Sequence, residues 1–116
     1  MEISKKNPLL LAFVGDAVMS QVVRAKLVEK DLKVSLLHTM ESTKVCARAQ
    51  SQKFEAMRGG FSEIEEEIAH AALNKTPNTL PKNCTQVEYR RATALEAVIG
   101  YNFLMENHDR VKELCE

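Results

Sequence analysis

The chain has 116 residues, of which 45% are hydrophobic and 28% charged, proportions that exclude a disordered protein. Its length suits one domain, residues 1–116, with a single core. The 16 basic and 16 acidic residues give a net charge of zero, so nucleic-acid binding would have to rest on a local cluster of lysines and arginines.

The three cysteines are Cys46, Cys84 and Cys115, far apart and never in a C-x-x-C pair. This pattern excludes a disulfide framework and a paired-cysteine zinc site, and it favours a reducing compartment. No N-terminal signal segment is visible, because MEISKKNP lacks an apolar run. We therefore expect a cytoplasmic protein with no membrane contact.

A first helix is predicted over residues 8–29, because Asn7 is a favourable N-cap and Pro8 is tolerated in the first turn. Asp16 is the only charged residue between positions 7 and 23, so the first half of the helix is apolar on nearly every side. This pattern indicates a buried central helix. Basic residues at its end (Arg24, Lys26, Lys30 and Lys33) are expected to form a solvated surface.

A second helix is predicted over residues 36–57, with Ser35 as its cap and two glycines as its stop signal. Ser62 and Glu65 have the spacing of a capping box and predict a third helix over residues 62–73. Its glutamates at 63, 65, 66 and 67 are expected to form a solvated first turn.

Residues 74–85 contain two prolines and three asparagines, which predicts an exposed loop. Helices are then predicted over residues 87–105 and 109–115. No alternation with the period of a strand is visible, so the predicted fold class is all-α with about five helices.

Asp16 and Glu96 form a matched pair, since each is the only acid in a long apolar stretch of its own helix. Each lies near a glycine, Gly15 and Gly100, and close packing of the two helices would explain both glycines. If the helices pack in this way, the two carboxylates meet at one small polar site.

Three chemistries use paired carboxylates. Glycoside hydrolysis also needs an aromatic groove, and the chain has only six Phe and Tyr. A di-iron bundle needs two Glu-x-x-His pairs, and the chain offers one, Glu67 with His70. A Mg²⁺ site needs only one or two carboxylates plus water and phosphate. The structural alternative is that Arg90 or Arg91 neutralises both acids within the fold.

Four motifs occur in order along the chain: GDAV at 15–18, His38 followed by V-x-A-x-x-Q at 45–50, PKN at 81–83, and YRxAT-x-x-EA-x-x-GY at 89–101. In this order and spacing they resemble the mini-ribonuclease III family, the catalytic domain of ribonuclease III without a separate double-stranded-RNA-binding domain. The resemblance implies the ribonuclease III endonuclease fold, a homodimer, and Mg²⁺-dependent cleavage of double-stranded RNA. The implied substrate is the precursor of large-subunit (23S) ribosomal RNA, and a ribosomal protein is a further candidate partner.

The resemblance also implies site residues. Asp16 and Glu96 match the catalytic, metal-binding acids of the family. Gln50, Lys82, Asn83, Tyr89 and Arg90 fall in motif segments near the active site or the RNA, and the basic residues Lys44, Arg48 and Arg91 are further candidates for RNA binding.

The chain also departs from ribonuclease III. Leu9, Ala12 and Thr93 occupy positions where the full-length enzymes have further acids, as in the mini form. The segment HAALNK at 70–75 replaces a basic, glycine-containing stretch, which puts RNA affinity in doubt. Two alternatives therefore remain open: a weak or inactive relative that binds structured RNA or a ribosomal assembly intermediate, and a helical dimerisation module with no role in RNA chemistry.

Overall fold

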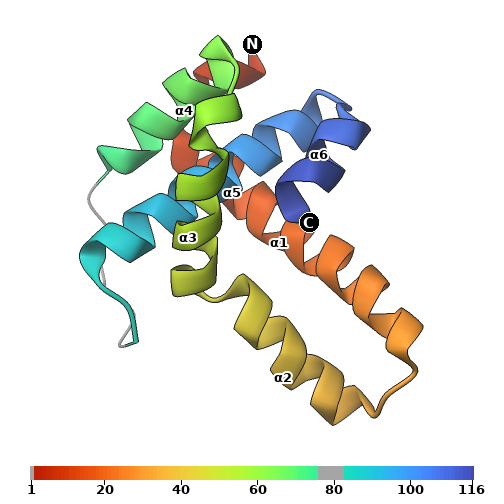
Figure 1. Cartoon of the computed structure of the whole chain (residues 1–116). Coiled ribbons are helices and arrows are strands. Elements are labelled where there is room, and N and C mark those ends of the chain that lie inside the picture. The colour runs from red at the N-terminus through yellow and green to blue at the C-terminus, as the bar shows by residue number, and fades with distance from the viewer. Residues whose placement is uncertain (1, 76–82) are drawn as a thin grey trace.

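A computed structural model describes residues 2–75 and 83–116 of the chain (Figure 1). These two ranges contain no strand and form three short 3-10 helices and six α-helices: α1 (Pro8–Leu27), α2 (Val34–Val45), α3 (Ala47–Met57), α4 (Glu63–Leu73), α5 (Gln86–Leu104) and α6 (His108–Cys115). The predicted all-α class is confirmed, with one helix more than expected. The predicted loop at 74–85 falls mostly outside the described residues.

Helix α5 lies at the centre of the fold, and α1, α3, α4 and α6 pack around it (Figure 1). Its consecutive residues from Ala92 to Leu95, and again from Ala97 to Asn102, are buried on all sides. The Thr85 side chain accepts a hydrogen bond from the backbone N–H of Glu88, and the Glu88 side chain accepts one from Thr85, so a capping box starts the helix.

Helix α1 is the main partner of α5. Together with the turn that follows it, residues 8–30, it is long and apolar enough to cross a membrane. Leu11, Val18, Met19 and Leu27 are buried inside the fold, however, and so the apolar character of α1 is used in the core. The predicted burial of this helix is found on one side only, since Leu10 and Phe13 are exposed and α5 takes the central place.

Two glycines set how closely α1 and α5 approach. A Cβ atom built on Gly15 would lie 1.8 Å from the carbonyl oxygen of Glu96, and one on Gly100 would lie 1.9 Å from the carbonyl oxygen of Leu11. Neither position has room for any side chain. The expectation that these glycines serve close helix packing is confirmed.

The prediction of one helix over residues 36–57 is wrong, because the chain breaks at Cys46 into α2 and α3. Cys46 is extended, with φ −65° and ψ 159°, and α2 begins after Lys33 with no side-chain cap, rather than after Ser35. The break lets α2 lie against the end of α1 while α3 packs against α5. No glycine or proline marks it, because packing rather than local propensity imposes it.

Helix α2 and the end of α1 form an arm that projects from the body of the molecule (Figure 1). The chain turns between them at Asp31, which has a left-handed backbone with φ 54°. Arg24 Nε donates a 2.8 Å hydrogen bond to Glu41, the only buried residue of α2. Arg24 therefore joins the two helices of the arm and does not belong to a purely solvated surface.

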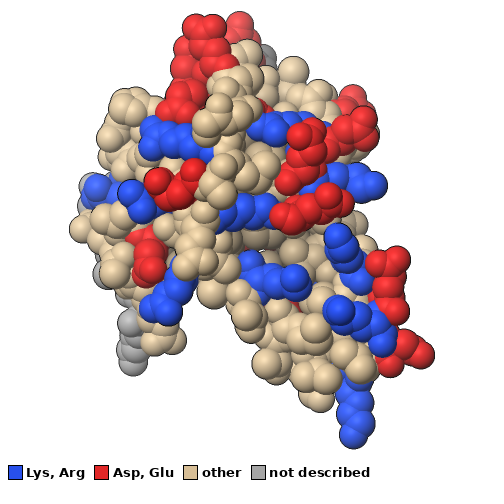
Figure 2. Space-filling view, viewed as in Figure 1, with Lys and Arg blue, Asp and Glu red and all other residues tan. Residues whose placement is uncertain are grey.

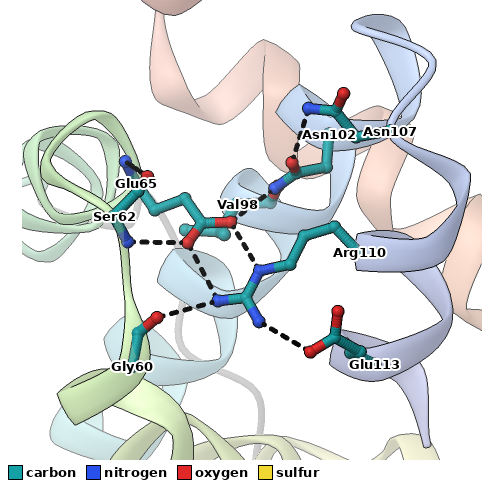
Figure 3. Close-up of polar contacts among 8 residues, drawn as sticks. All are labelled: Gly60, Ser62, Glu65, Val98, Asn102, Asn107, Arg110 and Glu113. Carbon is teal, nitrogen blue, oxygen red and sulfur yellow. Dashed lines mark hydrogen bonds and ion pairs between the residues drawn. The ribbon is translucent and has the colours of Figure 1, made fainter.

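Glu65 corrects the expectation of a fully solvated first turn in α4, since it is only 4% exposed. Its carboxylate accepts hydrogen bonds of 2.9 Å from two nitrogens of Arg110, from Asn102 Nδ2 and from the backbone N–H of Ser62 (Figure 3). Burial raises the pKa of Glu65, but these hydrogen bonds outweigh it and hold the pKa below its usual value. The ionised carboxylate thus links α4, α5 and α6.

Replacing Gly15 with alanine should destabilise the fold by roughly 3 kcal/mol or more, because the new methyl group meets backbone atoms that cannot move aside. Chemical denaturation would measure the loss. Gly59→Ala is the matched control, since a Cβ there meets nothing within 4 Å. Equal stability of the Gly15 and Gly59 variants would contradict the close helix approach.

Candidate active site

Asp16 and Glu96 lie together where α1 crosses α5. Asp16 directly follows Gly15, and Glu96 is one helical turn before Gly100, so the close approach of the two glycines brings the two acids to the same place. The carboxylate of Asp16 is close enough to that of Glu96 to share a hydrogen bond with it. The predicted meeting of the two acids is therefore found in the structure.

The two carboxylates have different surroundings. Asp16 is exposed, whereas Glu96 is partly buried. Burial, the hydrogen bond to Asp16 and the negative charge of Asp16 together raise the pKa of Glu96 to about 8, while a hydrogen bond from Gln50 opposes the shift. Without a bound cation, the pair therefore retains a proton near neutral pH.

Gln50 is the third polar group at this crossing and is brought there by α3. Its Nε2 donates a 2.6 Å hydrogen bond to the carbonyl oxygen of Val45 and a longer one, of 3.5 Å, to Glu96 Oε2. The residue is 4% exposed, and its Oε1 is buried without a hydrogen-bond partner among the described residues. Gln50 thus holds one oxygen of Glu96 and keeps an acceptor atom free, in agreement with its predicted place near the site.

The arginines expected near the acids have other surroundings. Arg91 forms a 3.2 Å ion pair with Glu55 on α3. Arg90 Nε is buried and lacks a hydrogen bond within the described ranges. Neither arginine is among the groups that shift the pKa of Glu96. The structure thus gives no support to the alternative in which an arginine neutralises the two acids.

The remaining RNA-binding candidates are spread over three places. Arg48 lies 3.5 Å from Glu88, and its side chain is 70% exposed. Lys44 lines a pocket that Gln50 also lines. Asn83 is exposed just before α5, and Lys82 lies outside the described residues. Of the candidates for RNA binding in the described ranges, therefore, only Gln50 is brought into contact with an acid of the pair.

The donor set of the site fits a hard, hydrated cation such as Mg²⁺. Mg²⁺ binds through one or two carboxylates and fills its other positions with water and substrate phosphate. Asp16 and Glu96 supply two carboxylates whose mutual repulsion a cation would compensate. The described part of the chain has no group of three or more His, Cys, Asp or Glu placed to hold a metal ion. Thr93, at a position where full-length ribonuclease III has an acid, adds no carboxylate. Its hydroxyl donates a 2.9 Å hydrogen bond to the carbonyl oxygen of Tyr89.

Sequence reasoning missed one group near the site. The residues at 16, 19, 23 and 26 recur at helical spacing, and therefore Lys26 continues the face of α1 on which Asp16 lies, while Lys30 follows in the 3-10 helix Val28–Lys30. Charge alone assigns the two lysines to a solvated cluster. Their position relative to Asp16 follows from the helical period, and this is the signal that could have found them.

In the metal-free protein, Glu96→Gln should remove a pH dependence of stability. Because the pKa of Glu96 is about 8 when folded and 4.5 as a free side chain, the folded state binds the extra proton between these values. Stability should therefore fall as pH rises from 5 to 8, by up to about 1.4 kcal/mol per pH unit, and more weakly in the variant.

Denaturation in a chelator at several pH values would measure this slope. Glu67→Gln, an exposed position on α4, is the control and should retain the slope of the wild type. An identical slope in the Glu96 variant would contradict the assignment of the proton to the acid pair.

Comparison with known proteins identifies the family to which the domain belongs. The family model described as "Ribonuclease III domain" matches residues 9–107 of this chain. Mini-ribonuclease 3 from Thermoanaerobacter sp. (strain X514) is 38% identical over 111 residues, covering 95% of this chain and 78% of the relative. Mini-ribonuclease 3 from Staphylococcus aureus is 37% identical over 111 residues, covering 93% and 83%.

A solved structure extends the similarity to the fold. The crystal structure of a protein from Fusobacterium nucleatum superposes with a TM-score of 0.92 at 30% identity, covering 99% of this chain and 93% of that one. The expected ribonuclease III fold is thus confirmed. The chain belongs to the ribonuclease III family and is an endoribonuclease of the ribonuclease III type.

Proposed function

We propose that this protein is a Mg²⁺-dependent endoribonuclease that cleaves double-stranded regions of structured RNA, with Asp16 and Glu96 as its catalytic, metal-binding acids. The observation that supports this assignment is the meeting of the two carboxylates at the Gly15–Gly100 crossing, inside a ribonuclease III domain. In this proposal residues 1–116 form a single catalytic domain that works in the cytoplasm.

Each residue of the site has a separate task. Asp16 and Glu96 would hold Mg²⁺, which when bound would supply polarisation of the scissile phosphate and a lower pKa of the attacking water. Asp16 is exposed and can reach both the cation and the substrate, whereas Glu96 is partly buried beside it. Gln50 holds Glu96 Oε2 through Nε2 and so orients the carboxylate. Loss of the proton held on Glu96 makes both carboxylates available as ligands.

The proposed substrate is the precursor of large-subunit (23S) ribosomal RNA, with a ribosomal protein as a candidate helper. The support is the similarity to proteins named Mini-ribonuclease 3, together with the motifs in the sequence. A duplex of A-form RNA offers its shape, phosphates and 2′-hydroxyls more than its base sequence. Recognition would then depend on basic residues around the site rather than on readout of bases.

We also propose that the protein is a homodimer that pairs through the exposed apolar start of α1. Leu10 is 58% exposed and Phe13 79%, on the same helix as Asp16. Large apolar side chains exposed together mark interaction surfaces. A second copy on this face would place two active sites against the two strands of one duplex.

The acids are tested by cleavage of a duplex RNA stem with and without Mg²⁺. The wild type should cleave only with the cation, and Asp16→Asn or Glu96→Gln should lower kcat by at least about 100-fold, since each removes a metal-binding carboxylate. Glu67→Gln is the matched control and should cleave normally.

Three outcomes would count against the proposal. Wild-type protein that binds the stem but does not cleave it would favour the RNA-binding module, and protein that does neither would favour a dimerisation module. Full cleavage by the Asp16 or Glu96 variant would refute the assignment of the site.

The dimer is tested by Phe13→Ser, which should raise the dimer dissociation constant about 30-fold or more, because aromatic anchors dominate such interfaces. Sedimentation equilibrium would measure the constant. Val34→Ser, another apolar-to-serine change at a 68% exposed position on the arm, is the control. A Phe13 variant that dimerises like the wild type would rule out this interface.

A further inference from the structure

A lysine-lined groove runs beside the part of α1 that follows Asp16. Its wider part, of about 700 Å³, lies between the end of α1, α2 and α6, and its lysines are Lys26, Lys30, Lys44 and Lys112. A narrower part of about 310 Å³ shares Val23, Lys44, Cys115 and Glu116 with it and adds Gln50 and Lys53. The two parts together lead from the arm to Gln50, which contacts Glu96.

Lysines outnumber acids along the groove. In the described ranges, Lys26, Lys30, Lys44 and Lys112 form no ion pair within 4 Å, and Glu29 and Glu116 are the only acids among the lining residues. Burial lowers the pKa of Lys53, and the charges of Lys44 and Lys26 lower it further, while Cys115 and Glu116 oppose the shift. Lys44 and Lys26 thus repel Lys53, and an anion in the groove would relieve this repulsion.

The arrangement fits a polyanion better than a small anion. Lys26 lies ten residues after Asp16, about 15 Å along the helix axis, and Lys30 lies farther still. One phosphate cannot reach both the Asp16 site and Lys26 over such a length, whereas successive phosphates of a strand can. The floor between the lysines is formed by Val23 and Leu27, along which the aliphatic stems of lysines can pack. Figure 2 shows basic side chains on the part of the arm that faces the body.

We propose that this groove, through Lys26, Lys30, Lys44 and Lys112, binds the phosphate backbone of the substrate RNA as it leaves the Asp16–Glu96 site. The inference rests on the proposed function and adds the path of the RNA. An acidic peptide would also match the charge, but the groove reaches Gln50, which contacts Glu96, and this favours RNA. The groove also supplies basic residues that HAALNK lacks at 70–75.

The test uses the double variant Lys26→Gln/Lys112→Gln, which leaves Asp16, Glu96 and Gln50 unchanged. Its affinity for duplex RNA in a chelator should fall roughly tenfold, and the slope of log affinity against log salt should flatten by about 0.7–0.9 for each phosphate that the variant no longer binds. With Mg²⁺, KM should rise while kcat stays unchanged, because the lysines do not touch the reacting atoms.

Two duplexes separate RNA tracking from a structural effect. One extends at least about 20 Å beyond the cleavage point, far enough to reach Lys26, and the other ends at that point. The variant should lose affinity for the long duplex only. Lys5→Gln/Lys33→Gln is the control with the same change in net charge, since both positions are exposed and neither lines the groove.

The groove proposal is overturned if the groove variant matches the control, or if it loses affinity equally for both duplexes. It is also overturned if the variant loses binding of a glutamate-rich peptide while its RNA affinity is unchanged. Wild-type binding of the long duplex without cleavage would count against the proposed function alone. No wild-type binding of this duplex would overturn both.

Discussion

The backbone contact between α1 and α5 at Gly15 and Gly100 is the constraint on which the rest of the structure depends. Each glycine leaves room for a carbonyl oxygen of the opposite helix, less than 2 Å from where a Cβ would lie. The same contact closes the core around α5 and brings together the acids of two helices. Stability and chemistry therefore depend on one geometric feature, so the glycines are constrained by both.

Glu65 and Glu96 show two ways in which the fold accommodates a carboxylate inside it. Glu65 is buried and ionised because Arg110, Asn102 and Ser62 all donate hydrogen bonds to it (Figure 3). Glu96 has Gln50 as a donor and another acid as its neighbour, so its pKa rises instead. The hydrogen bonds of Glu65 join three helices, whereas the repulsion between Glu96 and Asp16 is one that a bound cation would compensate.

The arm formed by α2 and the end of α1 brings basic residues together at the surface. The break at Cys46 directs α2 back along α1, and the Arg24–Glu41 ion pair joins the two helices. Lysines on α1, α2 and α6 then line one groove although they are distant in sequence. A chain with no net charge can in this way present a basic surface, because other acids, such as the exposed Glu63 and Glu67 of α4, lie outside the groove.

Local patterns in the sequence determined the helical class, the capping box of α4, the apolar character of α1 and the pairing of Asp16 with Glu96. These features depend on periodicity and on isolated charges in apolar runs, which are visible in a single chain. Tertiary packing alone decided the break at Cys46, the burial of Glu65 and the gathering of lysines into a groove. Each of these arises from residues that are far apart in sequence and become neighbours only when the helices pack.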